Sequence, residues 1–156
     1  MIVITKSPTA DTRTCDPTTV SKETLLRSSE QHIADVQQAI QFFTMKMHGE
    51  VWNHDRDKLT DIDWFHADFV TGFREHGWWD RHRQITRHHL SQPDGVPSDV
   101  NLLDVLEYIA DCCMAGMART GSVYPLELPA ALLQEAFINT VDLLKQQVVV
   151  KEEVKP

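Results

Sequence analysis

The sequence predicts an all-α fold of about five to seven helices, and three observations lead to this prediction. Apolar residues between positions 21 and 147 recur at helical spacings of three, four and seven. Proline and glycine clusters divide this region into segments of helical length. No two segments show a convincing pattern of paired strands. We therefore expect one helical domain over residues 19–147, between an irregular arm at 1–18 and a charged tail at 148–156.

The first helix is expected over residues 21–47, with Ser21 as its N-cap and Gly49 just beyond its end. A second short stretch begins near Val51 and contains His54 and Asp55. Apolar side chains of the first helix form one stripe, which we expect to face a core. The residues of this stripe are Leu25, Leu26, Ile33, Val36, Ile40, Phe43 and Met47.

Four further segments follow in the middle and C-terminal parts of the chain. A helix is expected from residue 60 or 61 to residue 73, and Gly77 separates it from a segment over 78–90. A proline- and glycine-containing loop, 91–97, leads to a helix over about 99–119 that Ser98 or Asp99 would cap. Pro129 favours the start of a last helix, which ends near residue 147. The valines at 148–150 are strand-like but isolated.

Composition limits the classes of partner. The chain has 156 residues and 42% hydrophobic residues, enough for one core. Its net charge of −8 argues against sequence-blind nucleic-acid binding, although a bound metal could still attract a small phosphorylated substrate. Three cysteines give no disulfide framework. We see no signal peptide and no segment of membrane-spanning length, so we expect a cytoplasmic protein that does not contact a membrane.

Histidines are concentrated in one part of the sequence. Seven of the eight lie between positions 48 and 89, and histidine suits both metal ligation and proton transfer. His54 and Asp55 are adjacent, and Lys58 follows to give His-Asp-x-x-Lys. Asp111 lies in an apolar helical segment, where a carboxylate has to be paired, hydrogen-bonded or metal-bound. The competing interpretation is that Asp55 only caps a helix.

The order His32, His54-Asp55, Asp111 resembles that of the HD superfamily of metal-dependent phosphohydrolases. This resemblance implies an HD-domain-like helical bundle. It also implies that His32, His54, Asp55 and Asp111 coordinate a first divalent ion, and that Lys58 faces the substrate phosphate.

A closer resemblance covers most of residues 30–115. It is to an uncharacterised phage and bacterial family with an HD-like layout. The shared elements are His32, His54-Asp55-Arg56-Asp57-Lys58, His82 followed by His88-His89, and Glu107-Tyr108-Ile109-Ala110-Asp111. After the His pair, this chain has Leu90-Ser91 where that family tends to have proline and an acid. It also lacks the Glu and the Gly-Tyr that follow the His pair in the related branch that hydrolyses cyclic dinucleotides.

The second histidine group admits two interpretations. His82 and His89 are seven residues apart and share one face if their segment is a continuous helix, so they are candidate ligands of a second ion. Alternatively, this segment is an exposed basic patch. In either case His82, His88, Arg81 and Arg87 are candidates for binding a substrate phosphate.

The favoured hypothesis is a metal-dependent phosphohydrolase of a small phosphate ester, with a nucleotide as the preferred substrate. Asp55 and Lys58 would take part in catalysis with Glu107, which would orient a ligand. Mn, Fe, Co, Ni, Zn and Mg all remain open as the divalent cofactor. The alternative is a non-catalytic HD-fold protein that binds a second copy or, if the chain is phage-encoded, a host protein in the host cytoplasm.

Overall fold

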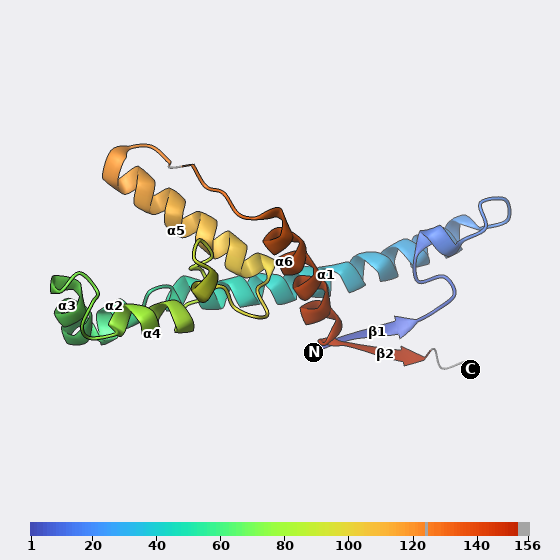
Figure 1. Ribbon diagram of the computed structural model, residues 1–156. Coiled ribbons are helices and arrows are strands. Elements are labelled where there is room, and N and C mark those ends of the chain that lie inside the picture. The colour runs from blue at the N-terminus through green and yellow to red at the C-terminus, as the bar shows by residue number, and fades with distance from the viewer. Residues whose placement is uncertain (124, 153–156) are drawn as a thin grey trace. The chain divides into compact units, whose positions relative to one another are not determined.

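The computed structural model describes residues 1–123 and 125–152, and most of these residues are helical (Figure 1). The α-helices are α1 (Lys22–Asn53), α2 (Asp57–Thr60), α3 (Ile62–Val70), α4 (Trp78–Ile85), α5 (Leu102–Thr120) and α6 (Ala130–Lys145). Short 3-10 turns, η1 (Thr12–Thr14) and η2 (Pro93–Gly95), and two strands, β1 (Ile2–Lys6) and β2 (Val148–Glu152), complete the elements. The predicted all-α class is confirmed, whereas an HD-like arrangement stays a prediction.

The chain divides into two compact units. One contains Met1–Met45 and the segment that begins at Asp142, and the other is Lys46–Val141. Helix α1 belongs to both units, because the division falls between Met45 and Lys46. Among the described residues, no helix combines the length and the apolar character that are needed to cross a lipid bilayer.

The first unit contains a strand pair that the sequence analysis did not expect. Strands β1 and β2 pair in parallel, with Ile2 opposite Val148 and Lys6 opposite Glu152. The expected irregular arm and charged tail therefore each contain a strand, and residues 153–156 of that tail lie outside the described residues. Because the partners come from opposite ends of the chain, no local pattern reveals the pairing.

Helix α1 begins as predicted and ends later than predicted. The Oγ of Ser21 accepts a hydrogen bond from the backbone N–H of Thr24 at 3.0 Å, as an N-cap does. The helix then continues through Gly49 to Asn53, so the predicted end at Gly49 is wrong. The predicted core stripe is also wrong in its first part, because five of its aliphatic residues remain between 40% and 59% exposed. These are Leu25, Leu26, Ile33, Val36 and Ile40.

The core of the second unit forms between α5, α6 and the segment that precedes α5. Its buried residues are Leu90, Val100, Val105, Tyr108 and Ala136. Helix α5 is capped by Asn101, not by Ser98 or Asp99 as predicted. The side chain of Asn101 accepts from the N–H of Leu103, and the carboxylate of Asp104 accepts from the N–H of Asn101. This reciprocal pair is a capping box, which fixes the start of α5.

Aromatic packing fixes α4 against α3. The rings of Phe65 and Trp78 are 4.3 Å apart, and the fully buried Trp78 stacks on His82 with ring centres 4.7 Å apart. The buried carboxylate of Asp68 accepts hydrogen bonds from the backbone N–H groups of His76 and Trp79. These contacts hold the first turn of α4 and thereby place His82.

Helix α4 ends at Ile85, so the segment over 78–90 is not one continuous helix, and the condition for His82 and His89 to share a helix face is not met. His88 and His89 lie in the turn that follows, and Arg87 ties this turn to the start of α5. Its guanidinium donates to both carboxylate oxygens of Asp104, at 2.7 and 2.9 Å, and to Asp99 at 2.9 Å.

We expect Arg87→Ala to lower the free energy of unfolding by about 1–3 kcal/mol, because it leaves the buried carboxylate of Asp104 without its charged partner. Urea denaturation followed by circular dichroism measures this change. The matched control is Lys145→Ala, which removes an exposed pair with Asp142 and should cost less than about 1 kcal/mol. Equal losses in the two variants would show that Arg87 does not brace the turn.

Candidate metal centre

Four side chains of the second unit converge on one point. Asp55 comes from the turn after α1, His82 from α4, and His88 and His89 from the turn after α4. Each offers one ligand atom, and the four atoms lie within 4.8 Å of one another. The Oδ1 of Asp55 is 3.4 Å from the Nε2 of His82 and 3.4 Å from the Nε2 of His88. Metal–ligand bonds of about 2.1 Å place tetrahedral ligand atoms about 3.4 Å apart, so this spacing fits a divalent ion.

The four converging atoms have no other partner among the described residues. The Oδ1 of Asp55 and the Nε2 atoms of the three histidines are buried, and none of them makes a hydrogen bond there. A buried polar atom without a partner costs about 1–3 kcal/mol, so four at one point need an explanation. A divalent cation could accept a lone pair from all four atoms, and histidine with carboxylate is a ligand set that several divalent metals take.

Carboxylates face the opposite ring nitrogen of two of these histidines. The Nδ1 of His82 is 2.8 Å from Asp57, and the Nδ1 of His88 is 3.0 Å from Glu107. A carboxylate in this position keeps the proton on Nδ1 and leaves the Nε2 lone pair for a metal. Asp57 is hydrogen-bonded to His82 and supports it in this way, whereas Glu107 lies 3.0 Å from His88 without a hydrogen bond to it.

Burial and neighbouring charges set the protonation of the group. Burial lowers the pKa of His82 although Asp57 opposes this shift, and burial with repulsion from His88 and His82 lowers the pKa of His89 to about 4. Both rings are thus neutral near pH 7, as a metal ligand has to be. Burial also acts to lower the pKa of His88, but Glu107 and Asp55 outweigh it and raise this pKa. Lys58 and nearby histidines lower the pKa of Asp55 against its burial.

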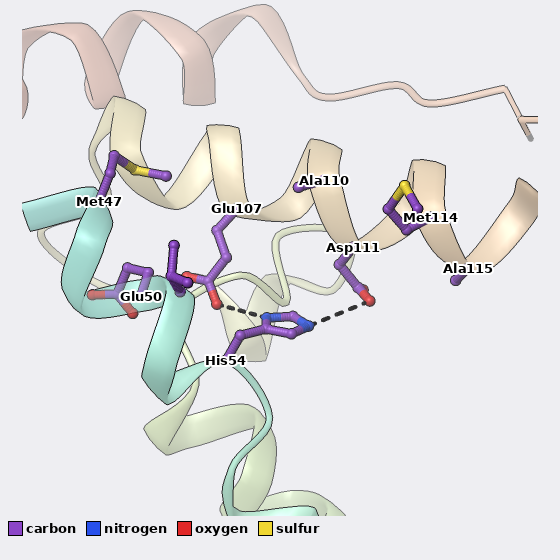
Figure 2. Close-up of a pocket in the computed structure, with 9 residues that line it drawn as sticks. Met47, Glu50, His54, Glu107, Ala110, Asp111, Met114 and Ala115 are labelled. Atoms are coloured by element: carbon purple, nitrogen blue, oxygen red, sulfur yellow. Dashed lines mark hydrogen bonds and ion pairs between the residues drawn. The ribbon is translucent and has the colours of Figure 1, made fainter. Parts of the chain in front are cut away.

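A second group of potential ligands adjoins the first. The Nε2 of His54 lies 3.7 Å from Asp111 Oδ1, and its Nδ1 lies 2.9 Å from Glu107 (Figure 2). The same Nε2 lies 3.7 Å from Asp55 Oδ2. Asp55 therefore faces the first group with one oxygen and the second with the other, as a carboxylate that bridges two metals does. The ammonium of Lys58 hydrogen-bonds the same Oδ2, so a positive charge already lies on this side.

The backbone brings His54 and Asp55 into the site by ending α1 sharply. Asp55 has φ of +50°, in the left-handed region, and α2 begins two residues later. Aspartate is one of the few residue types besides glycine that tolerate this conformation. Asp55 thus lies in the link between α1 and α2, and Asp57 and Lys58 are the first two residues of α2.

Most of the predicted site residues come together, although in groups that differ from the prediction. His54, Asp55 and Asp111 form one group, as expected. His82 was a candidate both for a second ion and for substrate binding, His89 for a second ion and His88 for substrate binding; the three form the four-residue group with Asp55. Because the side chains of His82 and His88 are at most 1% exposed, the interpretation of this segment as an exposed basic patch is wrong.

His32 is not part of any of these groups. It lies in the first unit, where its Nδ1 is 3.7 Å from a carboxylate oxygen of Asp11. The sequence analysis placed His32 and His54 on separate helices. The structure instead has one helix from Lys22 to Asn53, in which about six turns separate residue 32 from the end. The contribution of His32 to a metal site stays a prediction that no contact supports.

The two arginines proposed for phosphate binding have other partners. Arg81 donates to Asp61 at 3.0 Å, and its guanidinium lies 5.5 Å from the ring centre of Trp64. Arg87 forms the brace to Asp104 described above. Their role in substrate binding stays a prediction.

Comparisons with family models, with curated proteins and with solved structures gave no match to this chain.

Proposed function

We propose that this chain is a metal-dependent phosphohydrolase that acts on a small phosphate ester, with a nucleotide as the favoured substrate. The observation that carries the proposal is the convergence of four buried ligand atoms that lack any other described partner. The residues present fit a divalent ion, because they combine three imidazoles with one carboxylate. A divalent ion held there would lower the pKa of water toward neutrality and polarise a phosphoryl oxygen.

The neighbouring residues fit the other needs of phosphate-ester hydrolysis. Lys58 is half-buried beside Asp55 and can neutralise charge on a phosphate oxygen. His54 has a side chain that is 34% exposed, and Glu107 fixes its Nδ1. Its Nε2 can therefore exchange a proton with a bound ester or with water. Glu107 contacts both His54 and His88, so it connects the two groups of potential ligands.

A screen of phosphate release tests the proposal. Wild-type protein is incubated with a panel of small phosphate esters, including nucleotides, in Mn²⁺, Co²⁺ or Mg²⁺ and again with excess chelator. We expect metal-dependent release from at least one ester. We also expect His89→Gln, which removes one ligand atom, to lose more than about 100-fold in rate.

The matched control for this screen is His66→Gln, an exposed position on α3 that is in none of the potential ligand groups. This variant should keep the wild-type rate. If folded wild-type protein that has bound metal releases no phosphate from any ester, the hydrolase proposal is wrong. The non-catalytic interaction protein would then be favoured.

A further inference from the structure

A pocket of about 380 Å³ lies directly beside the candidate metal centre. Its walls come from the last turns of α1 and from one face of α5 (Figure 2). Apolar side chains cover most of it, from Met47 and Val51 on α1 and from Ala110, Met114 and Ala115 on α5. A volume at the lower end of the range of about 300–1,000 Å³ for ligand sites suits one ring system and not a dinucleotide.

The pocket shares its polar residues with the metal centre. His54, Glu107 and Asp111 line the pocket and also belong to the potential ligand groups. Figure 2 shows His54 between the side chains of Glu107 and Asp111, with Met47 and Met114 on opposite sides of it. A molecule whose phosphate lies near Asp55 and Lys58 can therefore place its organic part in this pocket.

Charge and shape select the kind of group that fits. Glu50 adds a third carboxylate to the lining, and no Lys or Arg is among the described residues that line the pocket. An anionic group is therefore disfavoured, whereas an N–H donor can bond to a carboxylate. Quaternary ammonium groups are recognised by aromatic cages, but His54 supplies the only ring in the described lining. Methionine sulfur makes favourable contacts with aromatic rings, and Met47 and Met114 both line the pocket, so an aromatic ring suits it.

We propose that this pocket binds a planar, uncharged, N–H-bearing ring, the class to which nucleobases belong. The inference rests on the proposed function in taking the ring to be the organic part of a phosphate ester. The ring of the ester, and not its sugar or its phosphate, would then determine which esters the site accepts.

Titration of metal-free protein with adenosine, ribose and choline tests the pocket without phosphate, metal or turnover. Binding is followed by ligand-observed NMR in wild type, in Ala115→Trp and in Val51→Trp, whose indoles would fill the pocket. Position 51 is 68% exposed and should tolerate tryptophan even if position 115 does not. The control is Ile109→Trp, on the opposite face of α5 and 43% exposed.

We expect adenosine to bind wild type and Ile109→Trp equally, and to bind the two pocket-filling variants at least about tenfold more weakly, a loss of about 1.4 kcal/mol. Ribose and choline should bind more weakly than adenosine. The inference is overturned if adenosine binds wild type no better than ribose, if choline binds better, or if neither pocket-filling variant weakens adenosine binding.

A separate Mn²⁺ titration shows whether a negative result contradicts the pocket assignment or the proposed function. Adenosine binding without Mn²⁺ binding would contradict the metal-dependent hydrolase and leave the pocket assignment standing. Mn²⁺ binding and phosphate release without adenosine binding would contradict only the pocket assignment.

Discussion

Replacing Asp55 by alanine is expected to abolish high-affinity metal binding and, with it, phosphate release. The carboxylate has one oxygen 3.4 Å from His82 and His88 and the other 3.7 Å from His54. Its loss therefore removes a ligand atom from the four-residue group and another from the group with His54 and Asp111. Loss of an outer partner of a ligand typically weakens metal binding about 10–100-fold, and we expect a loss greater than about 100-fold for Asp55 itself. Isothermal titration with Mn²⁺ measures the effect.

The matched control is Asp63→Ala, an exposed carboxylate in the first turn of α3 that is in none of the potential ligand groups. It should bind Mn²⁺ as wild type does, and circular dichroism should show native helix content in both variants. Wild-type Mn²⁺ affinity in folded Asp55→Ala would mean that the four-residue group is not the metal site.

Metal addition is expected to stabilise the folded chain strongly. The four ligand atoms come from positions 55 to 89 and are brought together only by folding, so an unfolded chain offers no comparable site. A free metal concentration of about 100 times Kd adds about 2.7 kcal/mol to the free energy of unfolding. For a chain of this size, that corresponds to a rise in Tm of about 5–10 °C.

Thermal unfolding in chelator and in excess Mn²⁺ or Zn²⁺ measures this rise. The same scans on Asp55→Ala should show almost no shift with metal, because its ligand set is incomplete. A rise of equal size in wild type and in Asp55→Ala would place the stabilising ion elsewhere in the chain. No rise in wild type would contradict the metal centre itself.

The sequence predicted where α1 and α6 begin and missed where α1 ends. Ser21 and Pro129 mark starts because a capping side chain and a fixed φ act within one turn. Gly49 fails as an end signal because glycine is tolerated inside a helix at a cost of only about 1 kcal/mol. The pairing of β1 with β2 joins opposite ends of the chain, and local periodicity carries no information about such contacts.

The sequence predicted which residues meet at the site better than it predicted how they are grouped. Proximity of His54, Asp55 and Asp111 followed from the resemblance, and the structure brings them together. His82 and His89 were expected to share one face if their segment were a continuous helix. The helix ends at Ile85, and His89 lies in the turn after it, which Arg87 braces. The two histidines still meet, although not through a shared helix face.

Asp57 is the residue that sequence reasoning undervalued. From the sequence it is a candidate general acid or base, with an ordinary solvated acid as the simpler interpretation; in the structure it lies 2.8 Å from the Nδ1 of the buried His82. Its position two residues after Asp55 was the available signal. The sequence did not reveal that Asp55 takes a left-handed conformation between α1 and α2.

A crystal structure of the Mn²⁺-soaked or Zn²⁺-soaked protein, with anomalous diffraction data, tests the central claim most directly. The account predicts an anomalous peak about 2.0–2.3 Å from the Oδ1 of Asp55 and from the Nε2 atoms of His82, His88 and His89. A peak held by other residues, such as His32, or no peak among these four side chains would contradict it.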